Sequence, residues 1–478
     1  MSGSVSQPGP RTERGLARTL THGQMTMIVL GSALGTGLFL GSGQAIAVAG
    51  PAVIISYALG SLLAAIIGGT TGEMAVRYPV RGGFGTIAAR YLGPFAGFLT
   101  RWAYWTATVV ITGIELVAVA TYLKFWWPQL PLWLGIVVFG ALIIGLNIKS
   151  VKYFGVIEFF LSSVKVIALS LFILVALCLI FFGLPNHPAA GVSALTDNGF
   201  MPTGITGAWL SMSIVMFSFG GIEMLSVSAA EAKDPARSVR TSAKAMMWRL
   251  GTFYVLAMFV ILALVPWQQA SQLGDSVEAS PFVLVFAQLG IPAIATITNL
   301  VVLVAALSAA NANLYAGTRL MHSLAMDSMA PTAMSRTSAS GIPVRAMWFS
   351  TSGVVLAIVL ATLAPKSAFG TMMTLTMVCA LTVWVLILMA YIGYRRVEGA
   401  TSDFLLPGGM WTAGLGVLML LAVWASLFAR TGGTLPAIAG VTYFVVLSMV
   451  YFGVVKRTHV PDDEAFAEAR MASGGGHE

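Results

Sequence analysis

Charged residues are scarce in this chain. Lys, Arg, Asp and Glu make up 9% of its 478 residues, against about 25% in ordinary soluble domains, while hydrophobic residues make up 57%. The connections between its apolar runs are too short to form a soluble domain. The composition therefore indicates a chain that lies in a lipid bilayer. The net charge of +8 does not require a nucleic-acid partner, because the distribution of the basic residues along the chain explains it as membrane topology.

Residues that would build a metal centre, a disulfide framework or a nucleotide site are also few. The two cysteines, Cys178 and Cys379, lie inside apolar runs, where they are expected to pack as small hydrophobic side chains. There is no phosphate-binding loop motif and no nucleophile with a base. We therefore expect no enzymatic activity, no metal and no organic cofactor. The histidines follow no metal-ligand spacing: His22, His187, His322, His459 and His477.

The beginning of the chain has no apolar stretch of the kind found in a secretory signal. Residues 1–22 are polar, so we expect a cytoplasmic tail and not a cleaved leader. A second cytoplasmic tail is expected at 457–478, which leaves 23–456 as one membrane domain.

Long apolar runs dominate the rest of the sequence and predict an all-α integral membrane protein of twelve helices. Each run is long enough to cross a hydrocarbon core of about 30 Å, and the alternating pattern of a membrane barrel is absent. The expected spans are approximately 24–48, 51–75, 95–123, 130–147, 155–182, 207–230, 244–266, 281–318, 343–364, 368–394, 411–429 and 435–455.

The basic residues predict the orientation of these spans. If the N-terminus is inside, only Lys124, Lys366 and Arg430 lie on the outer side, and Lys165 lies within a span. All other Lys and Arg residues then lie on the inner side. Both termini are therefore predicted to be cytoplasmic. The most basic stretch, 231–249, is interpreted as a topology signal and a solvated amphipathic helix.

Two of the expected spans contain sequences that favour a break. The first holds "GSALGTGLFLGSG" at 31–43, and the sixth holds "FSFGGIE" at 217–223. The sixth span comes five spans after the first, and because five is odd, the second set of five spans enters the membrane from the opposite side. This is the pattern of an inverted repeat, in which the substrate site lies between the two broken helices. The repeats are expected at about 24–182 and 207–394, with the last two helices, 411–455, outside them.

The chain resembles the amino acid-polyamine-organocation superfamily and, within it, the bacterial amino acid transporter family. The similarity lies in "GLARTLTHGQMTMIVLGSALGTGLFLGSG", "GFLTRWAYW", "FSFGGIEMLSVSAAEAKDPARSV" and "NLVVLVAALSAANANLYAGTRLMHSLA" and covers most of the chain. It departs at Arg240, where the family usually has proline, and at "RGGFG" after the second span. The resemblance implies a LeuT-type fold, in which spans one, two, six and seven rock against three, four, eight and nine.

The two breaks predict a site for an amino acid zwitterion. Backbone amides of Gly35, Thr36 and Gly37 are candidates to hold the α-carboxylate, because a broken helix leaves amides without intrahelical partners. The alternative is that these glycines only permit close helix packing, and packing is the favoured interpretation of Gly41 and Gly43.

The ammonium group of the substrate is predicted to bind carbonyls freed at both breaks. The candidates are Ala33 at the first break and Phe217, Ser218 and Phe219 at the second. The resemblance implies that the Phe217 ring covers the ligand as a gate; simple packing is the alternative.

Ionisable residues inside the predicted spans are the candidates for proton coupling. Lys165 lies near the middle of span five, and the resemblance implies that its ammonium takes the place of sodium in sodium-coupled relatives, with Ser308 and Asn311 supplying oxygens. A static structural ammonium is the alternative. Glu115 in span three either transfers the coupled proton or stays protonated throughout and donates a hydrogen bond to a neighbouring helix. Glu223 either takes up a proton during the transport cycle or caps exposed amides at the break.

Other charged residues receive simpler interpretations. Glu73 and Arg77 are spaced to form an interfacial ion pair along one helix, with a proton site as the alternative. Glu158 and Lys152 are expected to be topology or interface anchors at the inner start of span five.

The predicted function is a secondary active amino acid permease that imports a neutral or aromatic amino acid with protons by alternating access in the bacterial inner membrane. The proton is the only expected coupling ion, the partners are the substrate and the bilayer, and the sequence does not predict an oligomeric state. An exchanger of the same fold and a sensor that binds an amino acid without transporting it are the alternatives.

Overall fold

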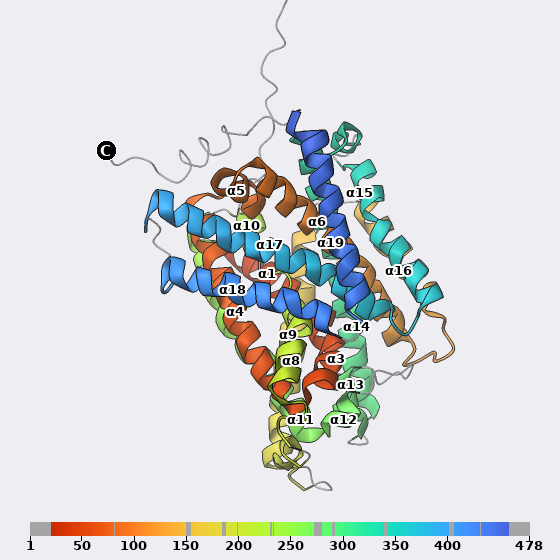
Figure 1. Cartoon of the computed structure of the whole chain (residues 1–478). Helices are drawn as coiled ribbons and strands as arrows, with labels where there is room; N and C mark the ends of the chain where they lie inside the picture. Colours follow the sequence, from red (N-terminus) through yellow and green to blue (C-terminus); the bar gives the residue numbers. More distant parts are fainter. Residues whose placement is uncertain are drawn as a thin grey trace, which may run out of the picture.

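The computed structural model describes residues 21–80, 82–149, 154–183, 188–197, 199–229, 232, 234–271, 280–288, 292–338, 342–400, 406–430 and 432–457. Both expected terminal tails lie almost wholly outside these ranges. Within the described residues the chain forms helices and no strand, and each of the expected spans falls on helix (Figure 1).

The helices of the first half follow the chain order of the expected spans. Their bounds are α1 His22–Ala33, α2 Thr36–Phe39, α3 Gly41–Ala49, η1 Gly50–Ala52, α4 Val53–Arg77, α5 Gly83–Leu92, α6 Pro94–Leu123, α7 Leu132–Lys149 and α8 Phe154–Phe181.

The second half begins with a short turn of 3-10 helix and continues to the end of the described chain. Its elements are η2 Ser193–Leu195, α9 Gly204–Val215, η3 Met216–Phe219, α10 Met224–Ala229, α11 Pro235–Leu264, α12 Trp267–Ala270, α13 Pro281–Gln288, α14 Pro292–Met326, η4 Thr332–Ser335, α15 Val344–Ser350, α16 Ser352–Leu363, α17 Ala368–Glu398, α18 Gly409–Ala429, α19 Thr434–Gly453 and η5 Val455–Arg457.

Ten helical stretches in the described part of the chain are long and apolar enough to cross a membrane. The number differs from twelve for two local reasons. First, the first expected span is interrupted, and its second half continues through η1 into α4 as one helical stretch, Gly41–Arg77. Second, the apolar helical stretch Leu132–Ile148, in the fourth expected span, is shorter than the other spans.

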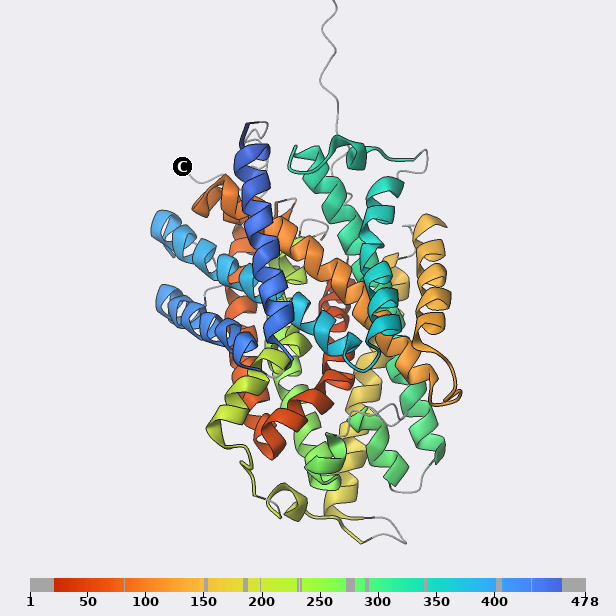
Figure 2. The same ribbon diagram turned by 45° about the vertical axis from the view of Figure 1, so that its right-hand side comes forward.

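Helix α6 forms the centre of the bundle. It packs against α14, α17, α5, α16 and α7, and 83% of its most apolar 18-residue segment is buried. Helices α17 and α18 lie side by side across the molecule in both views, with α19 packed against α17 (Figures 1 and 2). The central position of α6 brings its side chains to the inside of the bundle.

The basic stretch after the sixth expected span is continuous with the next membrane helix. Asp234 caps α11 by accepting a hydrogen bond from the Arg237 amide, and α11 then runs without interruption to Leu264. The amphipathic helix α5, by contrast, had no counterpart among the expected spans.

Candidate substrate site at two helix breaks

The first helix break lies inside the glycine-rich segment. Helix α1 ends at Ala33, and Gly35 takes an extended backbone with φ −117° and ψ −165° before the single turn of α2. The Gly35 amide donates a hydrogen bond to the Ala33 carbonyl oxygen at 3.1 Å. The glycine therefore stands where the chain leaves helical geometry.

The second break has a different local structure. After α9 the chain makes one turn of 3-10 helix, η3, and then extends at Gly220 with ψ 142°. Gly221 has a φ of +97°, a conformation that side chains rarely tolerate, before α10 begins. The two glycines of the "FSFGGIE" sequence thus form the exit from η3.

The two breaks contact each other through their backbones. A Cβ atom added to Gly37 would lie 2.7 Å from Ser218 Cα and 2.9 Å from the Phe217 carbonyl oxygen. Only glycine fits at this crossing, because the neighbouring atoms belong to the backbone and cannot rotate away.

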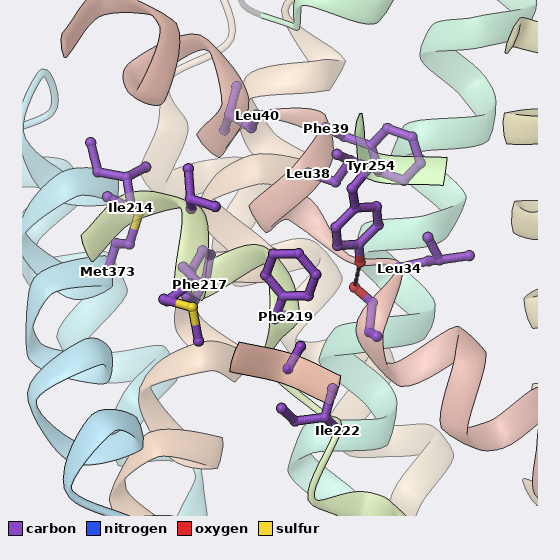
Figure 3. Packing of buried hydrophobic residues seen from close by; sticks show 14 of the residues in the cluster. Leu34, Leu38, Phe39, Leu40, Ile214, Phe217, Phe219, Ile222, Tyr254 and Met373 are labelled. Atoms are coloured by element: carbon purple, nitrogen blue, oxygen red, sulfur yellow. Dashed lines mark hydrogen bonds between the residues drawn. The ribbon is translucent and has the colours of Figure 1, made fainter. Parts of the chain in front are cut away.

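Tyr254 of α11 joins the same two segments. Its hydroxyl lies 2.6 Å from the Ala33 carbonyl oxygen and 2.8 Å from that of Ser218. Figure 3 shows the ring reaching the first break beside Leu34, with Phe219 of the second break close by. Tyr57 of α4 adds a hydroxyl contact of 3.0 Å to Ser218 Oγ. Two of the carbonyls predicted to bind the substrate ammonium thus already accept from a tyrosine.

A cavity opens beside the breaks. It is lined by Ala33, Gly35 and Gly37 of the first break and by Phe217 and Glu223 of the second. Helices α6, α14 and α17 supply most of the remaining walls, with several alanines among their side chains. Ser218 and Phe219 are buried away from it; Phe219 packs against Tyr57 and Tyr254.

Glu115 of α6 reaches across the cavity to the first break. Its Oε1 accepts from the Thr36 hydroxyl at 3.1 Å and from the Thr36 amide at 3.4 Å. The carboxylate is buried, with 3% of the residue exposed. The segment predicted to bind a substrate carboxylate is therefore in contact with a carboxylate of the protein itself.

Glu223 also lines this cavity. One oxygen accepts from the Gly221 amide at 3.2 Å and the other from the Trp384 indole at 3.1 Å. The contact with Gly221 is the amide cap that the sequence offered as one of its two interpretations.

Lys165 of α8 is buried and lies 3.8 Å from Glu158 on the same helix. Ser308 of α14 donates to both Glu158 oxygens, at 3.1 Å and 3.0 Å, and Ser162 donates to one of them at 3.1 Å. The serine predicted to support Lys165 thus contacts its acidic partner. Asn311 has another partner: its Oδ1 accepts from Asn147 of α7 at 2.8 Å.

The prediction that Glu158 anchors the chain at the membrane interface is wrong. The residue is 2% exposed and lines the cavity, whereas its expected companion Lys152 lies outside the described residues. A carboxylate near the start of a span is usually solvated, which is why the sequence favoured the anchor. The spacing of Glu158 and Lys165 by two helical turns places them on one face and was the available signal.

The expected Glu73–Arg77 pair is wrong as well. Glu73 is fully buried and accepts from Arg395 at 3.0 Å, from the Tyr391 hydroxyl at 2.7 Å and from the Leu406 amide at 2.9 Å. Contacts between distant parts of the chain outweigh a local pair worth only about 0.2–0.5 kcal/mol.

Comparison with known proteins agrees with this architecture. A family model described as amino acid permease matches residues 24–468. The chain belongs to the amino acid permease family. It is therefore a multi-pass membrane transporter of the amino acid-polyamine-organocation superfamily and not an enzyme.

Similar permeases cover nearly the whole chain. The aromatic amino acid transport protein AroP of Escherichia coli (strain K12) is 37% identical over 443 residues, which are 91% of this chain and 95% of the relative. The AroP protein of Salmonella typhimurium (strain LT2) is 38% identical over 80% of this chain and 83% of its own length. An uncharacterized amino acid permease of Bacillus subtilis (strain 168), YtnA, is 35% identical over 96% of this chain and 98% of its own.

The buried pair of this permease yields a test of stability. Glu158→Gln is expected to lower the free energy of unfolding by roughly 3–5 kcal/mol, because it leaves the Lys165 ammonium buried without its carboxylate. The Glu158→Gln, Lys165→Met double variant is expected to lose less than Glu158→Gln alone, since no unpaired charge remains. Thermal unfolding of the purified protein in detergent measures both, and a double variant that unfolds earlier than the single one would contradict the pairing.

Proposed function

We propose that the permease imports a neutral or aromatic amino acid together with protons by alternating access. The observation that carries the proposal is the crossing of the two helix breaks at Gly37 and Ser218 beside a buried cavity. Such a crossing offers backbone polar groups to both ends of a zwitterion, which brings its own matched charges.

The architecture that we propose has twelve spans in a LeuT-type arrangement, with both termini in the cytoplasm of a bacterium. The interruption of the first and sixth expected spans, five spans apart, supports the inverted repeat. In this arrangement α1–α4 and α9–α11 move against a scaffold that contains α6, α7, α14 and α16.

The substrate α-carboxylate is proposed to bind the amides of Gly35, Thr36 and Gly37, and its ammonium the carbonyls of Ala33 and the Phe217–Phe219 turn. Gly35 and Gly37 line the cavity, which supports the first assignment. Carbonyl oxygens have two lone pairs, so the Ser218 carbonyl that accepts from Tyr254 retains capacity for a second donor. The Ala33 carbonyl accepts from both Tyr254 and the Gly35 amide, so an ammonium there would replace one of these donors.

An aromatic side chain fits the cavity walls. Ala107, Ala312 and Ala380 leave room where larger residues would fill it, and Tyr104 and Trp384 offer aromatic contacts. Phe217 packs edge-on against Phe369 with ring centres 6.4 Å apart, and we propose that it swings over the ligand as a gate. The relatives named as aromatic amino acid transport proteins support this substrate class.

Proton coupling is proposed to involve Lys165, Glu115 and Glu223. All three are buried, and the two carboxylates line the cavity. Buried ionisable groups are costly in a membrane and are generally functional. Release of the proton to the cytoplasm would let the first span swing inward.

Uptake into proteoliposomes tests the proposal. With an inward proton gradient, labelled phenylalanine, tyrosine or tryptophan is expected to accumulate above its external concentration, and a protonophore is expected to abolish the excess. A panel of labelled acidic, basic and small neutral amino acids serves as the comparison. Flux that requires amino acid on the opposite side would indicate an exchanger, and binding without flux would indicate a sensor.

A further inference from the structure

Glu115 is hydrogen-bonded through only one of its two carboxylate oxygens. Oε1 contacts the Thr36 hydroxyl and amide, whereas the buried Oε2 has no hydrogen-bond partner among the described residues. The side chain lines the cavity, so the unpartnered oxygen is an available position for a proton. This arrangement is an unusual one for a permanently ionised, purely structural carboxylate.

We propose that the Glu115 carboxylate competes with the α-carboxylate of the substrate for Thr36, so that an amino acid binds together with a proton on Glu115. The inference rests on the proposed substrate orientation. In this step a proton from solution binds to the Glu115 carboxylate, which then no longer accepts hydrogen bonds from the Thr36 amide and hydroxyl. These two Thr36 donors instead donate to the substrate carboxylate.

Space at the first break supports the competition. A Cβ atom on Gly35 would lie 3.0 Å from Glu115 Oε1, so the carboxylate fills the volume directly against the backbone. A second carboxylate cannot reach the Thr36 donors while the first remains there.

The charges around the cavity also support competition between Glu115 and the substrate carboxylate. The Lys165 ammonium of α8 and the Tyr122 hydroxyl of α6 interact electrostatically with Glu115. Helix α14 brings the uncharged Ala309 to this point, and α17 lines the cavity without an ionisable group. Glu158 lies beside Lys165, and Glu223 contributes a further acid to the cavity. An added substrate carboxylate therefore meets acidic neighbours, and like charges at one site favour protonation of one of them.

The coupling is measured by the dependence of binding on pH. In wild-type protein, the Kd for labelled L-phenylalanine is expected to rise about tenfold per pH unit where Glu115 is ionised, because one proton is taken up for each ligand bound. A pH-indicator dye in weak buffer is expected to report about one proton taken up per phenylalanine bound. In Glu115→Gln the Kd is expected to be independent of pH, with no proton taken up.

An acid outside the cavity supplies the control. Asp197→Asn removes an exposed carboxylate that does not line the cavity, and it is expected to retain the proton uptake. If Glu115→Gln is not monodisperse, Glu115→Asp replaces it; its carboxylate is one methylene shorter and withdraws from Thr36, so a shallower pH dependence than wild type is expected.

The outcomes separate this inference from the proposed function. Proton-driven accumulation of phenylalanine with pH-independent binding in wild type would overturn the competition but leave symport intact. Binding with proton uptake but without accumulation would overturn symport and support the competition. Full pH dependence in Glu115→Gln, or an equal loss of pH dependence in Asp197→Asn, would overturn the role of Glu115.

Discussion

Replacement of Lys165 by methionine is expected to abolish proton-driven accumulation of substrate. Methionine preserves the length and apolar volume of the side chain but removes the ammonium that lies 3.8 Å from Glu158. In the coupling that we propose, loss of this cation unlinks the movement of the first span from the proton gradient. The ratio of internal to external labelled amino acid in proteoliposomes is expected to fall to about one, the value for uncoupled equilibration.

Lys124→Met is the matched control for this variant. Lys124 follows the C-terminal end of α6 and is partly exposed, so loss of its charge is expected to leave accumulation unchanged. Lys165→Met protein that still concentrates substrate to the wild-type level would show that the ammonium is structural and that another group carries the coupled proton.

Gly37→Ala is expected to disrupt the crossing of the two breaks. The new methyl group would lie 2.7 Å from Ser218 Cα and 2.9 Å from two further backbone atoms, none of which can move without displacing η3. Overpacking of this kind costs about 1–3 kcal/mol and here also moves the cavity wall. We expect earlier thermal unfolding and loss of amino acid uptake.

Gly41→Ala tests whether the loss comes from the crossing or from the motif in general. Gly41 belongs to the same glycine-rich segment, but an added Cβ would meet its nearest neighbours at 3.8 Å and 3.9 Å, which is ordinary contact. It is expected to unfold and transport like wild type. Equal damage from both substitutions would contradict the importance of the contact between Gly37 and Ser218.

The sequence predicted the breaks because local chemistry determines them. Gly221 adopts a positive φ that other residues resist, Gly37 permits the close approach of the two backbones, and the structure interrupts the helix at both segments. Lys165 and Glu115 were identifiable for a similar reason: an ionisable residue deep in an apolar run stands out without knowledge of its neighbours.

Partners far apart in the chain were not predictable in this way. Glu73 pairs with Arg395 and not with Arg77, because packing of α17 against α4 brings the arginine within 3.0 Å. Tyr254 carried no signal, since a tyrosine in an apolar span is ordinary until its hydroxyl is seen between two carbonyls. Helix α5 is too short and too amphipathic to have been found by a search for membrane spans.

The hydroxyl of Tyr254 has a consequence for the affinity of the site. It bridges the two breaks, Tyr57 holds Ser218 from α4, and Thr26 of α1 contacts Ser242 of α11 at 2.9 Å. These contacts hold the unwound segments in place through the protein's own side chains. A ligand that enters the cavity meets preorganised backbone, so little of its binding free energy is lost to ordering flexible chain. In the proposed binding mode, selectivity can then depend on the side chain of the ligand, because the preorganised backbone binds the groups that all amino acids share.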